Sequence, residues 1–98
     1  PLKNHIIYNL SKAGLLALTQ SLAKDLAPTV RVNGVSPGAI MWPKTINKKR
    51  KKEIISKIAL QRIGEPDDIA KTILFLITNG DYITGQNINV DGGRRLNM

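Results

Sequence analysis

The pair of residues best suited to chemistry is a tyrosine and a lysine near the start of the chain. Tyr8 and Lys12 are four residues apart, with Ser11 between them. In a helix, positions i and i+4 lie on one face, about one turn apart, so both side chains can point into the same site. An ammonium beside a phenol stabilises the phenolate. The pair is therefore suited to passing a proton to or from a carbonyl oxygen or an imine nitrogen.

A helix must hold this pair, and the sequence predicts one from about Ile6 to Ala27. Leucines recur at spacings of three and four residues, as on one face of a helix: Leu15, Leu18, Leu22 and Leu26. Small residues occupy the neighbouring faces, which is typical of a helix that packs against more than one neighbour. Pro28 ends the helix, because the residue before a proline is pushed out of the helical region.

Two short strands are expected after this helix. The β-branched run from Val30 to Val35 predicts the first strand, and the sequence Ser36-Pro37-Gly38 ends it. The run from Gln86 to Val90 predicts the second. A turn at Asp91-Gly92-Gly93 follows, where the glycines supply unusual backbone angles.

Two helices are expected between the strands. A basic amphipathic helix runs from about Lys48 to Leu60, after an irregular segment at 39–47. The last helix begins at Pro66, carries Asp67 and Asp68 in its first turn, and ends at 79–80. This order of elements predicts an α/β fold in which crossover helices join parallel strands. Two strands alone leave unpaired edges, so we expect the fragment to need more sheet than it contains.

Composition narrows the class of protein. The chain has 98 residues, of which 42% are hydrophobic, so one small domain with a packed core is possible. It has no cysteine and one histidine, His5, so we expect neither a disulfide nor a metal site. No apolar run approaches the roughly 20 residues that span a bilayer. These features fit a cytoplasmic protein without a membrane partner.

The formal net charge of +8 is concentrated in one stretch. The cations of this stretch are Lys44, Lys48, Lys49, Arg50, Lys51, Lys52 and Lys57. A solvated helix face explains them most simply. A nucleic-acid or anionic surface, and a phosphate-bearing cofactor or acidic substrate, are the alternatives. No aromatic residue lies among these cations to stack on bases, so we expect no nucleic-acid partner.

Several stretches strongly resemble the short-chain dehydrogenase/reductase family. They occur in the family's order, at about its spacing, and cover nearly the whole chain. They are residues 8–14 (YNLSKAG), 26–28 (LAP), 30–38 (VRVNGVSPG), 62–70 (RIGEPDDIA) and 83–93 (ITGQNINVDGG). Within the family, Pro1-Leu2-Lys3 and the segment Pro37 to Pro43 look most like bacterial pteridine reductases of the dihydropteridine or dihydromonapterin type.

The resemblance implies roles for individual residues. In the family, the tyrosine that matches Tyr8 is the proton donor. The lysine that matches Lys12 assists this tyrosine and hydrogen-bonds the nicotinamide ribose. The backbone of the Pro-Gly turn meets the nicotinamide. The expected catalytic residues are therefore Tyr8 and Lys12, and the expected cofactor-binding residues are these two with Pro37, Gly38, Ala39 and Ile40.

The loop after this turn departs from the family pattern. Many members have a threonine about four residues past the glycine, where it touches the cofactor phosphates. This chain has Met41 and Trp42 there and Thr45 only later, so we do not assign that contact. By the resemblance, the loop from Met41 into the basic helix is the substrate lid. Trp42 either faces a flat pterin ring or anchors a core or an interface. Asn33 is expected to be a buried hydrogen-bonding residue rather than a catalyst.

By the same resemblance, residues 1–98 form the C-terminal half of one Rossmann-fold reductase domain. This half holds the catalytic helix, the substrate lid and the last two strands of a doubly wound parallel sheet, which is incomplete as given. The family's glycine-rich phosphate loop and catalytic serine do not occur in the 98 residues. We therefore expect the polypeptide alone neither to bind the dinucleotide tightly nor to turn over.

The expected activity of the complete protein is NADPH-dependent reduction of a pterin, with the choice of NADPH taken from the pteridine-reductase resemblance. A 3-oxoacyl carrier-protein reductase, another short-chain dehydrogenase, and a non-catalytic truncated remnant are the alternatives. Family members are usually tetramers in which the tyrosine-bearing helix packs against its copy. We expect the helix at 6–27 to make that contact.

Overall fold

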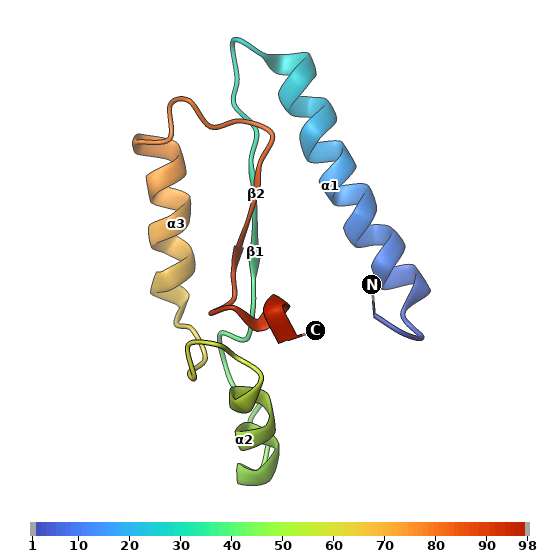
Figure 1. Ribbon diagram of the computed structural model, residues 1–98. Coiled ribbons are helices and arrows are strands. Elements are labelled where there is room, and N and C mark those ends of the chain that lie inside the picture. Colours follow the sequence, from blue (N-terminus) through green and yellow to red (C-terminus); the bar gives the residue numbers. More distant parts are fainter. Residues whose placement is uncertain (1, 98) are drawn as a thin grey trace.

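The structure, a computed structural model, describes residues 2–97 and has helices on both sides of a pair of strands (Figure 1). The elements are α1 (Ile6–Leu26), β1 (Gly34–Pro37), α2 (Lys48–Ser56), α3 (Pro66–Thr78), β2 (Asn87–Val90) and the 3-10 helix η1 (Arg94–Asn97). Helices α1 and α3 lie on opposite sides of the strands, and α2 lies beyond one end of them. The predicted α/β fold class and element order are confirmed, and η1 is an addition that the sequence did not predict.

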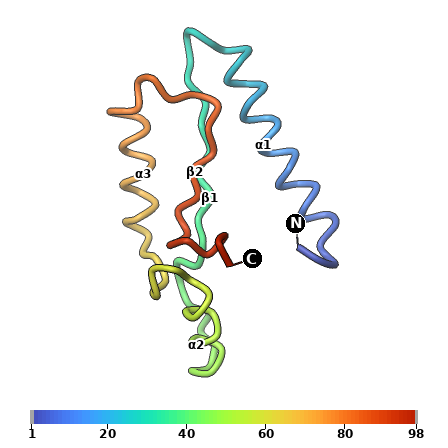
Figure 2. Tube along the Cα trace, in the orientation of Figure 1, coloured from blue at the N-terminus to red at the C-terminus, as the bar shows by residue number. Residues whose placement is uncertain are grey.

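Strands β1 and β2 run parallel, as predicted. Gly34 lies opposite Asn87, and Pro37 lies opposite Val90. The two traces lie side by side in Figure 2. The chain between them passes through α2 and α3, which gives the long crossover that a parallel pair requires. Because the strands are parallel, the segments that follow them, from Gly38 and from Asp91, leave at the same edge.

The first strand begins later than predicted. The expected range was 30–35, whereas the paired residues are Gly34–Pro37. Before Gly34, the Val32 N–H donates to the Thr84 hydroxyl at 3.1 Å, and the Gly85 N–H donates to the Val32 carbonyl at 2.7 Å. Gly85 has a φ of +75°, so the backbone turns here and cannot continue as a strand. Regular pairing starts only where this turn ends.

Pro37 was expected to break the strand and instead closes it. The Gly34 and Gly38 N–H groups donate to the carbonyl oxygens of Gln86 and Val90, at 2.8 and 2.9 Å. Alternate residues of a strand point the same way, so the nitrogen of Pro37 points away from β2. The missing N–H of proline therefore removes no bond from this pair.

Helix α1 meets the strands through its small residues and not through its leucines. Thr19 and Ala23 are buried, at 9% and 4% exposure. A Cβ added at Gly85 would lie 3.5 Å from the Ala23 side chain, so helix and turn approach closely. The predicted apolar stripe remains 39–57% exposed: Leu15, Leu18, Leu22 and Leu26. The described part of the molecule thus leaves this stripe without a packing partner.

Helix α2 ends earlier than predicted, at Ser56 instead of near Leu60. Its start is capped by the Asn47 side chain, which accepts the Arg50 N–H at 2.8 Å. Beyond the helix, Leu60 donates its N–H to the Gly92 carbonyl at 2.9 Å. A bond to the turn after β2 replaces a bond within the helix, so the helix cannot continue through these residues.

The core of the described chain is small. Its buried hydrophobic residues are Ala23, Ile58 and Leu76. Large apolar side chains of α3 stay exposed, including Leu74 at 60% and Ile77 at 65%. No helix within residues 2–97 is both long and apolar enough to cross a membrane.

Candidate active site

Tyr8 and Lys12 occupy the first two turns of α1. Both lie in the regular part of the helix, so they share one face, as the spacing predicts. The Tyr8 side chain is 55% exposed, whereas Lys12 is half-buried. The Lys12 amine donates a hydrogen bond to the Ser36 hydroxyl oxygen at 2.7 Å. The lysine therefore links the candidate catalytic helix to β1.

Ser36 and Asn87 form a polar contact that the sequence analysis missed. Ser36 is buried, at 8% exposure. Its hydroxyl oxygen lies 3.2 Å from Asn87 Oδ1 and 3.1 Å from Asn87 Nδ2. The two residues are 51 positions apart, and only the pairing of β1 with β2 brings them together. Ser36 was expected in the break that ends the strand, so the sequence pattern did not indicate this contact.

The predicted cofactor-binding turn, residues 37–40, follows β1 at the carboxyl edge of the strands. Its backbone is fixed at two points. The Gly38 N–H donates to the Val90 carbonyl, and the Ala39 carbonyl accepts the Gly64 N–H, both at 2.9 Å. Within residues 2–97, the N–H and C=O of Ile40 take no part in these backbone bonds. Ile40 therefore offers one peptide donor and one peptide acceptor that a ligand can use.

Gly38 is required where the two strands end. A Cβ at this position would lie 2.7 Å from both Cα and Cβ of Asp91, which is closer than real side chains come. The turn after β1 and the turn after β2 thus touch at the carboxyl edge of the sheet. In open α/β sheets, ligands bind outside this edge.

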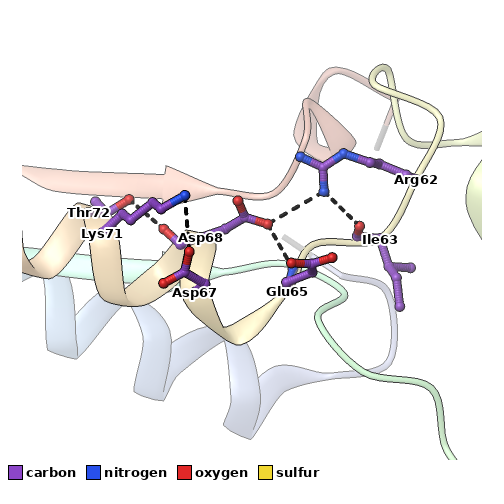
Figure 3. A network of polar contacts seen from close by, with 7 residues as sticks. All are labelled: Arg62, Ile63, Glu65, Asp67, Asp68, Lys71 and Thr72. Carbon is purple, nitrogen blue, oxygen red and sulfur yellow. Dashed lines mark hydrogen bonds and ion pairs between the residues drawn. The ribbon is translucent and has the colours of Figure 1, made fainter.

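The loop before α3 supports the turn at 37–40 through the Gly64 N–H, and Figure 3 shows the polar contacts within this loop. The Asp68 carboxylate accepts the Glu65 N–H at 2.8 Å and pairs with the Arg62 guanidinium at 3.4 Å. The backbone bond from Glu65, with Arg62 adding to it, holds the pKa of Asp68 below its ordinary value. The loop is thereby folded into a fixed shape that presents the Gly64 N–H to Ala39.

One turn along α3, Lys71 pairs with Asp67 at 3.0 Å on the surface (Figure 3). The hydrogen bond from Lys71 to this carboxylate raises the pKa of Lys71. Both side chains are largely exposed, so the pair belongs to the helix surface and not to the candidate site.

Trp42 lies in the loop predicted to be the substrate lid. Its ring is half-buried, and the Lys51 amine lies 5.6 Å from the ring centroid. This is the geometry of a cation–π contact, which joins the loop to α2. The contact fits an anchoring role for Trp42, and a role toward a substrate stays a prediction. The other cations of α2, Lys48, Lys49, Arg50 and Lys52, are exposed, as expected for a solvated helix face.

The side chains of Asn33 and Asp91 form hydrogen bonds with backbone groups. Asn33 donates to the Ile83 carbonyl at 2.9 Å and accepts the Gln86 N–H at 3.0 Å. Asp91 accepts the N–H groups of Gly93 and Arg95 at 3.0 and 3.2 Å. Both residues shape turns, which confirms the predicted hydrogen-bonding role of Asn33, although its side chain is half-buried rather than buried.

Known proteins resemble this chain over nearly its whole length. A family model described as enoyl-(acyl carrier protein) reductase matches residues 1–95. The 3-oxoacyl-[acyl-carrier-protein] reductase of Thermotoga maritima is 43% identical over 90 residues, which cover 88% of this chain and 37% of that protein. YusR of Bacillus subtilis, named a short-chain dehydrogenase/reductase homolog, is 44% identical over 90 residues, covering 91% of this chain and 69% of that protein.

A solved structure agrees with these matches. The crystal structure of a protein from Brucella melitensis, described as short-chain dehydrogenase/reductase SDR:Glucose/ribitol dehydrogenase, superposes with a TM-score of 0.76 at 38% identity. It covers 89% of this chain, and the chain covers 35% of that protein. The chain thus spans little more than a third of this protein and of the Thermotoga maritima relative.

Proposed function

The chain belongs to the short-chain dehydrogenase/reductase family, and we propose that it carries the proton-transfer and nicotinamide-contacting residues of an NADPH-dependent reductase. In this proposal, residues 1–98 are the C-terminal half of one Rossmann-fold domain. The observation that carries it is the position of Lys12, one turn from Tyr8 on α1 and hydrogen-bonded to Ser36 on β1. This arrangement sets a phenol and an ammonium beside the carboxyl edge of the strands.

Lys12 has donors to spare for a cofactor. An ammonium carries three N–H donors, and Ser36 accepts one of them. Two donors remain, which matches the two neighbouring hydroxyls of a nicotinamide ribose. Because Ser36 and Asn87 are neutral, the positive charge of Lys12 also remains available to stabilise a phenolate on Tyr8.

The turn at 37–40 fits the nicotinamide carboxamide. The free N–H and C=O of Ile40 can bind the oxygen and the nitrogen of a carboxamide, while the Gly38 N–H and the Ala39 C=O are held by their own bonds. When bound, NADPH supplies a hydride for the substrate carbon. The part of this chain is to hold the ring and to deliver the proton from the Tyr8 hydroxyl to the carbonyl oxygen.

We propose a 3-oxoacyl thioester as the substrate. The resemblance in the sequence pointed first to a pterin, but the Thermotoga maritima relative is named for 3-oxoacyl-[acyl-carrier-protein] reduction, and so is one from Aquifex aeolicus at 43% identity. These names favour the alternative that the sequence analysis left open. Part of the evidence for the pterin type was the stretch Pro1-Leu2-Lys3. Its first residue, Pro1, lies outside the residues that the structure describes.

A second copy of the chain is the proposed partner of α1. The leucine stripe of this helix is 39–57% exposed, and burial of apolar area is the main force that drives such contacts. A helix packed against its own copy would cover the stripe, as the family resemblance implies.

The test is a chimera in which residues 1–95 replace the matching segment of the Thermotoga maritima reductase. We expect NADPH oxidation with an acetoacetyl thioester and little with a dihydropterin. Tyr8→Phe should lower kcat by about 100-fold or more, since it removes the proton donor. Tyr82→Phe is the matched control, because Tyr82 is fully exposed and far along the sequence. A folded chimera that keeps its rate with Tyr8→Phe would refute the proposal.

A further inference from the structure

Ser36 and Asn87 hold the Lys12 ammonium from the side of the strands. We propose that these two residues are a neutral positioning clamp for Lys12, and that Gly34 is required to make room for it. The proposal rests on the proposed function of Lys12. Its basis is the hydrogen bond of 2.7 Å from Lys12 to Ser36, and the contacts of 3.1 and 3.2 Å from Ser36 to the Asn87 amide.

The Ser36 hydroxyl is hydrogen-bonded on two sides, by Lys12 and by the Asn87 amide. A hydroxyl has one hydrogen to donate and two lone pairs to accept with. Lys12 donates to one lone pair, and the Asn87 amide either accepts the hydroxyl hydrogen through Oδ1 or donates to the second lone pair through Nδ2. The serine oxygen is therefore oriented by Asn87, and it presents one fixed acceptor to the lysine. Because Ser36 is buried, water does not compete freely for that acceptor.

The clamp fixes the lysine without neutralising it. Asn87 is an uncharged amide, and a carboxylate in its place would form an ion pair with the ammonium through or beside Ser36. An ion pair would weaken the electrostatic attraction between Lys12 and a phenolate or ligand hydroxyls. An amide also gives up no proton near neutral pH, so Asn87 ends the hydrogen-bond chain. The three residues hold a charge in place and do not carry protons away.

Gly34 supplies the space that the Asn87 side chain occupies. A Cβ on Gly34 would lie 2.6 Å from Asn87 Oδ1, and 3.6 Å from its Cγ. Gly34 and Asn87 are also direct partners in the register of the two strands. A side chain at position 34 would therefore push the amide away from Ser36. The identity of residue 34 on one strand thus decides whether residue 87 on the other can orient the serine.

The first test observes the Lys12 ammonium by NMR in the 98-residue chain with isotope-labelled lysine. Lys12→Arg identifies the signal, and Lys24, exposed on the same helix, is the internal reference. We expect the Lys12 ammonium protons to exchange with water about tenfold more slowly than those of Lys24, the effect of one hydrogen bond to a charged group. Ser36→Ala should abolish the difference, and Ser36→Thr, which keeps the hydroxyl, should restore it.

A second pair of variants tests the part played by Gly34. Gly34→Ala should remove the slow exchange, as Asn87→Ala does, because both leave Ser36 without its orienting amide. If the Lys12 protons exchange as fast as those of Lys24 in the unaltered chain, or stay slow in Ser36→Ala, the clamp does not exist. An unfolded chain gives the same fast exchange, so dispersed amide signals in each variant are the control for folding.

The chimera with the Thermotoga maritima reductase separates a positioning role from a structural one. Asn87→Asp keeps the shape of the clamp and adds a negative charge, so kcat should fall about tenfold while folding is retained. Equal kcat values for Asn87→Asp and the unaltered chimera would overturn the positioning role. Failure of the proposed function looks different, because a chimera that is indifferent to Tyr8→Phe leaves the NMR result on Lys12 intact.

Discussion

The Gly64 N–H donates to the Ala39 carbonyl oxygen at 2.9 Å, and this bond joins the loop before α3 to the turn after β1. Arg62 and Asp68 hold that loop in shape from within, through an ion pair at 3.4 Å. The segment at 62–68 therefore supports the candidate nicotinamide turn although none of its residues is proposed to touch a ligand. Its role is to fix which peptide groups remain free at Ile40.

Substitution at Gly64 should disturb this turn. A Cβ there would lie 2.8 Å from Ile40 Cδ1 and 3.4 Å from Asp68 Oδ2, so Gly64→Ala must displace the end of the isoleucine side chain. We expect the KM for NADPH in the chimera to rise by about tenfold, the effect of losing one well-made hydrogen bond to the carboxamide. Steady-state kinetics at varied NADPH measure it.

Gly14→Ala is the matched control for that variant. A Cβ at Gly14 meets nothing within 4 Å, and the position is inside α1. The substitution should raise the free energy of unfolding by up to about 1 kcal/mol through helix propensity and leave the KM for NADPH unchanged. An unaltered KM in Gly64→Ala would mean that the loop and the turn are not coupled.

Asp68 should make the free energy of unfolding depend on pH in the acid range. Its pKa lies below the ordinary value of 3.8, first because of the Glu65 backbone bond. A carboxyl whose pKa is lower in the folded state than in the unfolded state stabilises the fold at any pH above its unfolded-state pKa. It loses this contribution as the pH falls through its folded-state pKa. Asp68→Asn should therefore lower stability at pH 7 and reduce the loss of stability below about pH 4.

Urea unfolding at pH 7 and pH 3 measures both effects. Asp81→Asn is the control, because Asp81 is an exposed aspartate outside the loop. If Asp68→Asn and Asp81→Asn change stability equally at both values of pH, the Asp68 bonds contribute nothing to the fold.

Arg31 should stabilise the end of α3. Its guanidinium donates to the carbonyl oxygens of Leu76 and Gly80, at 2.8 and 2.7 Å, which closes the helix from the segment before β1. Arg31→Met keeps the apolar stem and should lower the free energy of unfolding by about 1.5–3 kcal/mol, as for hydrogen bonds to a charged group. Arg31→Lys should recover only part of it, since an ammonium lacks the second planar nitrogen, with which Arg31 also donates to the Ile77 carbonyl at 3.3 Å.

Thermal unfolding of both variants, with Arg95→Met as an exposed control, checks this expectation. A loss with Arg31→Met no larger than with Arg95→Met would show that the helix end does not depend on the guanidinium.

Sequence reasoning reached the features that depend on neighbours along the chain. The helical spacing of Tyr8 and Lys12 and the start of α3 at Pro66 follow from local periodicity and from the chemistry of helix ends. The clamp of Ser36 and Asn87 does not, because it depends on a strand register between residues 51 positions apart. The same applies to the start of β1, which the turn at Gly85 decides.

The leucine stripe of α1 shows what local periodicity cannot predict. Periodicity identified the stripe correctly as one face of a helix. It could not tell which neighbour covers that face, because apolar burial is not directional. The strands took the face of Thr19 and Ala23 instead, where small side chains allow close approach.

Two glycines, Gly85 and Gly93, allow the cost of backbone strain to be measured separately from the cost of a steric clash. Gly93 and Gly85 both have positive φ, at +86° and +75°. A Cβ at Gly93 would lie 2.7 Å from the Ala59 Cβ, whereas at Gly85 the nearest atom is 3.5 Å away, an ordinary contact. Gly85→Ala should therefore cost only the backbone strain, about 1–2 kcal/mol. Gly93→Ala should cost this strain plus a steric term of about 1–3 kcal/mol.

The difference between the two unfolding free energies then measures how firmly the turn at 91–93 packs against Ala59, in the segment that follows α2. Denaturant unfolding of both single variants gives it, and the combination Gly93→Ala with Ala59→Gly removes the opposing methyl group. If the clash is the cause, the double variant should recover most of the steric term after the cost of Ala59→Gly alone is subtracted. Equal costs for Gly93→Ala and Gly85→Ala would instead mean that the turn moves away freely, and that the segment at Ala59 is not held by it.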